Sequence, residues 1–216
     1  MTSQSPTRVL LVDDHEIVRE GCRRLLQAEN DIKVIAEASS GELACRQYDS
    51  YQPDVVVMDL SLPGIGGIET SKRLLNHHPQ AKIVIFTMHE NPILIQKAIK
   101  IGAKGFLNKA ATRVKLADAV RTVMKGEIYL ESGTALSIAK NHMIGASNPL
   151  ASLSDRELEI FQLITTGKST AQAAEILHLS PKTVSNHSSR IKKKLGVSTM
   201  AELIRVAIDA GIISSM

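Results

Sequence analysis

The sequence predicts two domains of different class, an open α/β domain followed by a smaller domain built only from helices. Up to about residue 126, short runs of Val, Ile and Leu alternate with amphipathic segments. Beyond about residue 150 the strand-like runs stop, and helical segments follow one another. A chain of 216 residues is long enough for two ordinary domains.

Five apolar runs are expected to form the strands of the first domain. The runs are continuous rather than alternating, which indicates strands that are covered on both faces, as in a parallel sheet. Repeated alternation of strand and helix predicts an open sheet with helices on both faces. The predicted strands are 8–14, 33–38, 54–60, 82–88 and 105–108, and the predicted helices lie near 15–28, 41–50, 66–77, 91–101 and 112–125.

Each helix expected in the second domain has a start signal. Ser154, Ser169 and Thr199 are each followed three residues later by Glu or Gln, which is the capping-box pattern. Ser180 precedes Pro181, an arrangement typical of an N-cap followed by proline at the first helical position. These signals predict helices near 155–166, 170–178, 181–195 and 200–210.

A stretch rich in Gly, Ser and Asn separates the two patterns and is predicted to be a linker. We therefore expect a first domain over 7–126, a linker over 127–149 and a helical domain over 150–216.

The composition indicates a cytoplasmic globular protein without membrane association. Hydrophobic residues make up 44% and charged residues 22% of the chain. No apolar stretch reaches the roughly 18 to 20 residues of a membrane span. The N-terminal segment MTSQSPTR lacks the apolar part of a secretory signal. Cys22 and Cys45 have no metal-type spacing and are expected to be free thiols.

Polar side chains close four of the predicted strands. The first strand ends in Asp13 and Asp14, the third in Asp59, the fourth in Thr87 and the fifth in Lys109. Because parallel strands all end at the same edge of a sheet, we expect these side chains to converge there.

Three carboxylates placed together repel one another unless a cation joins them. Mg²⁺ prefers oxygen ligands and keeps coordination positions for water and phosphate oxygens. In such a site Asp59 would be both a metal ligand and a nucleophile towards phosphorus, because carboxylates form acyl phosphates. Lys109 and Thr87 would neutralise the phosphoryl oxygens. The alternative is that each Asp only caps the loop that follows its strand.

A basic helix is expected between Lys182 and Lys194, a stretch that contains five basic residues and no acidic one. Val184, Ile191 and Leu195 recur at helical spacing and predict a buried stripe. With the helix and short turn before it, this segment predicts a helix-turn-helix that enters a DNA major groove. The alternative is a solvated basic face on a small helical bundle.

Four segments of the first domain resemble the receiver domain of two-component response regulators: VDDHE, VVVMDLSLPGIGGIE, FTMHE and GAKGFLNKA. The resemblance implies a flavodoxin-like (βα)5 doubly wound fold with strand order 2-1-3-4-5. It implies that a sensor histidine kinase phosphorylates Asp59, and that Asp13, Asp14, Asp59 and the Ser61 backbone carbonyl hold Mg²⁺. Thr87 would be the switch hydroxyl, Lys109 the phosphate-pairing lysine and Phe106 the rotating aromatic residue. Ala110 follows Lys109, where many receivers have proline.

Residues 150–213 resemble the LuxR-type DNA-binding domain in three segments: LSDRELEIFQLI, GKSTAQAAEILHLS and TVSNHSSRIKKKLG. Together with the receiver, this is the architecture of the NarL/FixJ class. The resemblance implies that Ser185, Asn186 and Ser189 face bases, and that Lys182, Thr183, Arg190 and Lys193 contact the DNA backbone. The family often has Lys where Ser185 stands, so the base preference should differ. The last helix, with Leu203, Ala207 and Ile208, would be the dimer surface, or else simply core.

Within the class, the segments LPGIGGIET, HENP and SLSDRELEI are most similar to regulators of the GacA/UvrY type. Such regulators answer hybrid sensor kinases and drive small regulatory RNA genes. The resemblance implies four partners: DNA, a cognate sensor histidine kinase, a second copy of the chain on activation, and RNA polymerase. Phosphorylation would shift dimerisation or domain arrangement and promote DNA binding.

Two other functions remain open at this point. One is a phosphatase or phosphotransferase with an Asp nucleophile. Haloacid-dehalogenase-type enzymes have a second Asp two residues after the nucleophile as general acid, and Ser61 stands at that position here. The other is a constitutive DNA-binding protein whose receiver is only a dimerisation scaffold.

Overall fold

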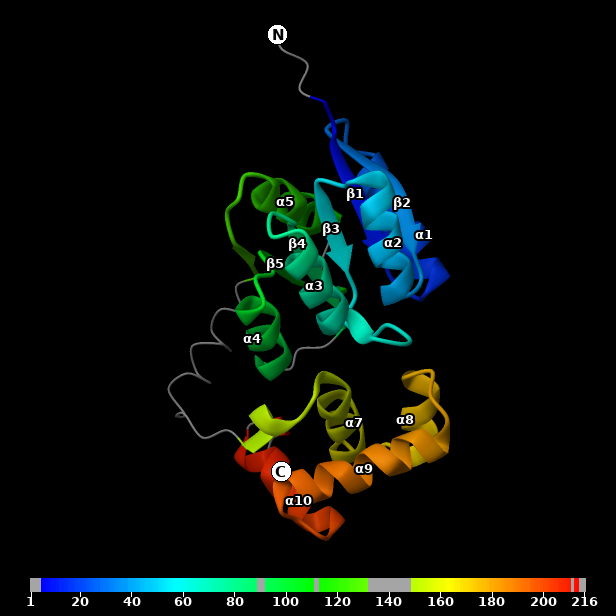
Figure 1. The fold of residues 1–216 in the computed structure, drawn as a ribbon, viewed down its shortest axis with the longest axis vertical. Coiled ribbons are helices and arrows are strands. Elements are labelled where there is room, and N and C mark those ends of the chain that lie inside the picture. The colour runs from blue at the N-terminus through cyan, green and yellow to red at the C-terminus, as the bar shows by residue number, and fades with distance from the viewer. Residues whose placement is uncertain (1–4, 89–91, 111–112, 132–148, 211, 214–216) are drawn as a thin grey trace. The chain divides into compact units, whose positions relative to one another are not determined.

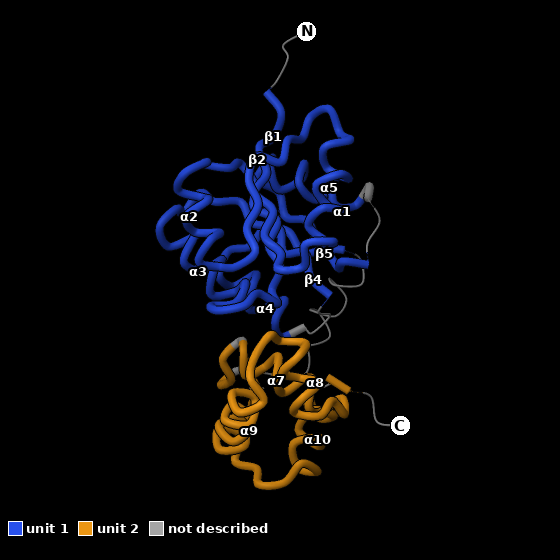
Figure 2. The backbone as a smooth tube through the Cα atoms, turned by 90° about the vertical axis from the view of Figure 1, so that its right-hand side faces the viewer, with its two compact units in different colours: residues 1–141 blue, residues 142–216 orange. Residues whose placement is uncertain are grey.

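The computed structural model describes residues 5–88, 92–110, 113–131, 149–210 and 212–213. The chain divides into two compact units, residues 1–141 and 142–216 (Figure 2). Most of the segment predicted to be a linker, 132–148, lies outside the described residues.

The first unit is a parallel sheet with helices on both faces, as predicted (Figure 1). The predicted strands form with bounds that differ by at most two residues at either end, and their order β2-β1-β3-β4-β5 is confirmed. They are β1 (Thr7–Val12), β2 (Ile32–Ala38), β3 (Val55–Met58), β4 (Ile83–Thr87) and β5 (Gly105–Asn108).

A sixth strand, β6 (Tyr129–Leu130), was not predicted and falls in the segment expected to be a linker. It pairs in parallel with β5 at the edge of the sheet. Two residues are too few to show a strand period in the sequence, so pattern analysis misses such an element.

Two helices cover one face of the sheet and three cover the other. Helices α1 (Glu16–Gln27) and α5 (Arg113–Met124) share one apolar cluster with the strands. Helices α2 (Gly41–Tyr51), α3 (Gly66–His77) and α4 (Pro92–Lys100) lie on the opposite face.

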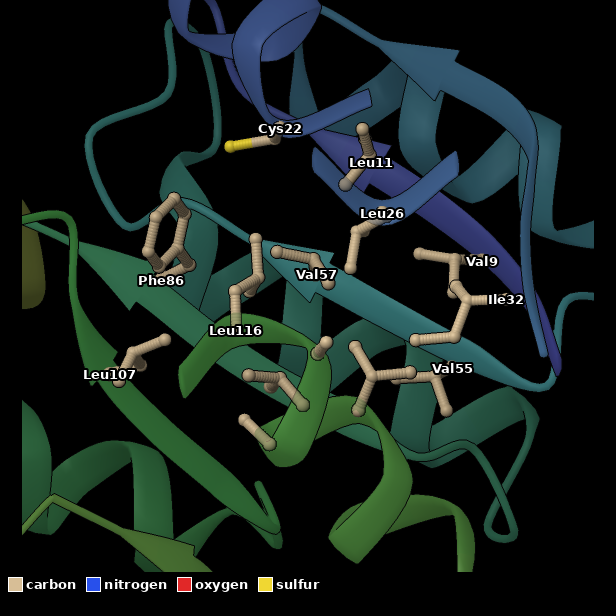
Figure 3. Packing of buried hydrophobic residues seen from close by; sticks show 14 of the residues in the cluster. Val9, Leu11, Cys22, Leu26, Ile32, Val55, Val57, Phe86, Leu107 and Leu116 are labelled. Atoms are coloured by element: carbon tan, nitrogen blue, oxygen red, sulfur yellow. The ribbon is translucent and has the colours of Figure 1, made fainter. Parts of the chain in front are cut away.

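The core of the first unit explains why its strands are apolar throughout. Figure 3 shows Leu26 of α1 and Leu116 of α5 packed with Val55 and Val57 of β3. The intervening residue Val56 faces the other layer and is also fully buried. Both faces of β3 are therefore covered, and the strand can hold the residue that follows it in a fixed place.

The second unit contains the four predicted helices and no strand among its described residues. The capping boxes at Ser154, Ser169 and Thr199 are confirmed, and Ser180 accepts a hydrogen bond from Thr183 N. Each such cap typically contributes about 1 kcal/mol. A short 3-10 helix, η1 (Pro149–Ser152), precedes α7 (Asp155–Thr165), α8 (Thr170–Ile176), α9 (Pro181–Leu195) and α10 (Met200–Asp209).

Helix α9 packs against both α7 and α8, and α10 packs against α7. Helix α9 ends at Gly196, whose φ of 69° is the left-handed conformation that glycine adopts easily. Among the helices that the structure describes, none combines the length and the apolar character that crossing a membrane requires.

Candidate functional site

The polar residues that close the strands lie at the carboxyl edge of the sheet. Val12 of β1 is in register with Met58 of β3, so the residues that follow, Asp13 and Asp59, emerge side by side. The Asp59 N–H donates to the Val12 carbonyl at 2.9 Å. On the other side of β3, the Lys109 N–H donates to the Thr87 carbonyl at 2.9 Å.

Lys109 joins two of the carboxylates. Its Nζ lies 2.6 Å from Asp13 Oδ2 and 2.7 Å from Asp59 Oδ2. All three side chains are less than 10% exposed. Burial by itself lowers the pKa of Lys109, but the Asp59 and Asp13 carboxylates outweigh burial and raise it above its usual value. The ammonium form is therefore strongly favoured.

Two opposing effects act on the pKa of Asp59, and the net pKa is raised above its usual value. Burial raises the pKa of its carboxyl group, and the neighbouring Lys109 opposes that rise. Asp59 Oδ1 is buried and makes no hydrogen bond to any residue that the structure describes. A buried oxygen without a partner is rare and marks a position where another atom would fit.

The site has the donor chemistry of a hard divalent cation. Ligand atoms of Asp13, Asp14, His15 and Asp59 all lie within 4.8 Å of one another. Carboxylate oxygens dominate this set, and Asp59 Oδ1 adds an oxygen without a partner in the described chain. His15 was not predicted as a site residue from the sequence. In the structure its Nδ1 lies 2.8 Å from Asp14 Oδ1.

The loop after β3 holds Asp59 through close backbone packing. Ser61 lies in this loop, which passes through Gly64 and Gly66 with φ values of 76° and 70°. A Cβ on Gly67 would lie 1.9 Å from the Asp59 carbonyl oxygen. Only glycine fits at position 67, so the start of α3 can approach the reactive strand end.

The side chains of Thr87 and Phe106 are both buried. Thr87 is the last residue of β4, and Phe106 pairs with Ile85, two residues earlier in the same strand. None of the described residues has a cis peptide bond, and this includes the Lys109–Ala110 bond, where many receivers carry a proline.

In the second unit, α9 presents one buried and one exposed side. Val184 and Ile191 are fully buried as predicted, and Leu195 is half-buried. The exposed residues are Lys182, Ser185, Asn186, Ser189, Arg190 and Lys193. Thr183 is half-buried. Its backbone N–H and its hydroxyl both contact the Oγ of Ser180, the N-cap residue of α9.

The predicted dimer residues of α10 separate into two groups. Leu203 and Ala207 are fully buried inside the unit, so the core alternative is the correct one for them. Ile208 is 37% exposed and stays available for contact. An apolar stripe has the same period whether it packs on its own domain or on a partner, which is why the sequence did not separate these roles.

Two family models match the chain over most of its length. Residues 9–121 match the response regulator receiver domain, and residues 151–207 match the luxR family of bacterial regulatory proteins. The chain belongs to the response regulators. It combines a receiver domain with a LuxR-type domain, the architecture of the NarL/FixJ class, whose members regulate transcription and are not enzymes.

Curated relatives match almost end to end. The chain is 42% identical over 207 residues to the response regulator UvrY of Escherichia coli (strain K12), covering 94% of each chain. It is 35% identical over 210 residues to the response regulator GacA of Pseudomonas viridiflava, covering 96% of this chain and 98% of that one.

Solved structures of the same class are also similar. A LuxR-family two-component response regulator from Aurantimonas sp. SI85-9A1 is 40% identical, with a TM-score of 0.62 over 64% of this chain and 99% of its own. RcsB of Salmonella enterica serovar Typhimurium, bound to promoter P1flhDC in the presence of the phosphomimetic BeF3-, is 26% identical. Its TM-score is 0.63, covering 94% of this chain and 98% of that chain.

Proposed function

We propose that this response regulator is a transcription factor switched by phosphorylation of Asp59. A sensor histidine kinase supplies the phosphoryl group, and phosphorylation promotes sequence-specific DNA binding through α9. The observation that carries the proposal is the buried Asp59 Oδ1, which has no partner in the described chain and lies beside Asp13 and Lys109. Its proposed domains are a receiver over 7–126, extended by β6 at the edge of the same sheet, and a DNA-binding domain over 150–216, and both would act in the cytoplasm.

In the first step, an Asp59 carboxylate oxygen attacks the phosphorus of a kinase phosphohistidine. A phosphorus–oxygen bond forms, the phosphorus–nitrogen bond breaks, and the imidazole nitrogen keeps the bonding electron pair. The product is an acyl phosphate on Asp59. Strand β3 and the loop that leads to Gly67 leave the Asp59 backbone little freedom. They therefore fix the direction from which its carboxylate oxygen would attack phosphorus.

Asp13, Asp14, Asp59 and the Ser61 backbone carbonyl would hold Mg²⁺, which when bound neutralises charge on the phosphoryl oxygens. Lys109 pairs with Asp13 and Asp59 before phosphorylation. Its ammonium would then turn towards the phosphoryl group, which carries more negative charge than a carboxylate. The Thr87 hydroxyl would donate to another phosphoryl oxygen.

The signal would leave the site through Thr87 and Phe106. Both side chains are buried. Movement of Thr87 towards a phosphoryl oxygen would free space in the β4–β5 layer for the Phe106 ring. A ligand that favours one of two packings shifts a pre-existing equilibrium, and this is the form of the proposed switch.

On the DNA side, the exposed face of α9 supplies both kinds of contact. Lys182, Arg190 and Lys193 would bind DNA phosphates. Thr183, in the first turn of α9, would add a contact to the DNA backbone. Ser185, Asn186 and Ser189 would reach base edges in the major groove. That the similar RcsB has been solved bound to a promoter supports DNA binding by this chain.

A second copy of the chain on DNA would use the exposed Ile208. Two helices related by a two-fold axis would then read half-sites about one helical turn apart.

The test is a DNA-binding titration with genomic fragments, with and without acetyl phosphate and Mg²⁺. Phosphate uptake is followed in parallel by the mobility shift of the phosphorylated chain in a phosphate-affinity gel. The proposal predicts one phosphoryl group per chain and tighter DNA binding, both lost in Asp59→Asn. Equal DNA affinity with and without the phosphodonor in the wild type would point instead to a constitutive DNA-binding protein.

A further inference from the structure

Every hydrogen-bonding group of Asp13 is held by a different part of the first unit. Its N–H donates to the Ala38 carbonyl at 3.0 Å. Its Oδ1 accepts from His15 N at 2.9 Å, and its Oδ2 contacts Lys109 Nζ at 2.6 Å. The remaining group is the carbonyl oxygen, which accepts from Arg19 Nη1 at 2.7 Å.

The Asp13 carbonyl belongs to the peptide that joins Asp13 to Asp14. Because a peptide unit is planar, whatever holds its oxygen also fixes the direction in which the chain enters Asp14. Arg19 therefore acts on the relative placement of two carboxylates of the site, although it touches neither carboxylate.

Arg19 is itself fixed from β2. It lies one turn into α1, and its side chain reaches back towards the helix N-terminus, the usual direction for a long helical side chain. Its Nε donates to Glu37 Oε2 at 3.1 Å, and its side chain is only 16% exposed. Glu37 precedes Ala38, the residue that accepts the Asp13 N–H. The guanidinium thus links the end of β2 to the turn after β1.

The planar fork of arginine suits this link better than a lysine would. A guanidinium donates in two fixed directions at once, here to a carboxylate and to a backbone carbonyl. A lysine ammonium is a single point charge on a flexible stem, so it does not hold both acceptors in the same geometry.

We propose that Arg19, held by Glu37, is a positioning residue of the acidic site. It orients the Asp13–Asp14 peptide so that both carboxylates face Asp59 and a divalent cation. This inference rests on the proposed function, because it assigns Arg19 to the cation site that phosphorylation of Asp59 uses. Residues that orient ligands in this way typically change metal affinity about 10- to 100-fold when they are replaced.

Arg23 provides a matched control on the same helix. It also contacts Glu37, at 3.3 Å, and pairs with Glu20, but it makes no contact with Asp13. Arg19→Lys and Arg23→Lys make the same chemical change and disturb the same carboxylate. Only Arg19→Lys removes the bond to the Asp13 carbonyl.

The experiment measures Mn²⁺ binding to the full-length unphosphorylated chain by electron paramagnetic resonance. For Arg19→Lys we expect the half-saturating Mn²⁺ concentration to rise about 10-fold, and for Arg23→Lys we expect no change. Phosphorylation by acetyl phosphate should slow in Arg19→Lys at low Mg²⁺ and recover at saturating Mg²⁺. If Arg19→Lys fails to fold by circular dichroism, Glu37→Leu decides, with weaker Mn²⁺ binding expected because a leucine offers Arg19 Nε no acceptor.

Wild-type Mn²⁺ affinity in Arg19→Lys would overturn the inference, and so would equal weakening in Arg19→Lys and Arg23→Lys, which would indicate a general effect on α1. Both results leave the proposed function intact. A wild-type chain that binds neither Mn²⁺ nor phosphate would instead overturn the proposed function, and this inference with it.

Discussion

Replacing Lys109 with methionine tests the electrostatics of the site, because methionine keeps the length of the side chain and removes its charge. The ammonium contacts Asp13 and Asp59 at 2.6 and 2.7 Å, and its side chain is 8% exposed. Removing one partner of a buried ion pair typically costs about 3–5 kcal/mol, because the other charge stays buried and unpaired. Two carboxylates lose their partner here, so we expect at least about 3 kcal/mol.

Tyrosine fluorescence reports this change selectively. The chain has three tyrosines and no tryptophan, and Tyr48, Tyr51 and Tyr129 all belong to the first unit. Urea unfolding in the presence of EDTA should therefore show a lower midpoint for Lys109→Met. Adding Mg²⁺ should recover part of the loss, since a ligand at about 100 times its Kd stabilises the folded state by about 2.7 kcal/mol.

A suitable control is Lys115→Met. Lys115 pairs with Glu131, but its side chain is 46% exposed, and ion pairs between exposed side chains contribute little to stability. If Lys109→Met is as stable as the wild type in EDTA, or if both lysine variants lose the same stability, the Lys109 ammonium does not stabilise the buried carboxylates.

Three further predictions concern the loop after β3, the second unit and the DNA interface. Gly67→Ala should displace Asp59 and abolish phosphate uptake, because its Cβ would lie 1.9 Å from the Asp59 carbonyl oxygen. Gly21→Ala, where a Cβ meets nothing within 4 Å, should leave uptake unchanged and stabilise α1 by about 1 kcal/mol. Burial alone raises the pKa of Glu157, but hydrogen bonds from Lys194 and Ser154 outweigh it, and the net pKa is lowered. The contribution of Glu157 is therefore present above its unfolded pKa of about 4.3 and is lost as pH falls through the folded value. Unfolding of the second unit is detected as a far-UV circular dichroism change without a change in tyrosine fluorescence. Its midpoint should fall as pH falls in the wild type, and should fall less in Glu157→Gln. Lys193→Ala should weaken binding to all DNA sequences and reduce the salt slope by about 1, whereas Asn186→Ala should relax specificity at one base position. Fluorescence anisotropy with matched and mutated operators separates these two outcomes, and equal losses on every sequence would contradict the role of Asn186.

Much of the site follows from the sequence because its residues occupy one topological position. Asp13, Asp59, Thr87 and Lys109 each end or follow a strand, and parallel strands place such residues at one edge. The continuous apolar run before Asp59 predicts a strand buried on both faces, and Val55 to Met58 are all buried. Helix caps are local signals, so the N-caps at Ser154, Ser169 and Thr199 could also be predicted from the sequence.

Features that depend on packing between distant segments could not be predicted from the sequence. The bond from Arg19 to the Asp13 carbonyl needs the start of α1 to lie against the end of β2, and no residue pattern records that approach. The contact between Gly67 and Asp59 likewise depends on how close α3 comes to β3. Leu203 and Ala207 carried an apolar pattern that fits a core or an interface equally well, and only their burial separates the two.

The most direct measurement of the central claim is the DNA affinity of the wild type and of Asp59→Asn, each with and without acetyl phosphate and Mg²⁺. If phosphorylation of Asp59 is the switch, the phosphodonor tightens DNA binding by the wild type and leaves the DNA affinity of Asp59→Asn unchanged. A phosphodonor response that persists in Asp59→Asn, or that is missing in a wild-type chain shown to carry phosphate, would contradict it.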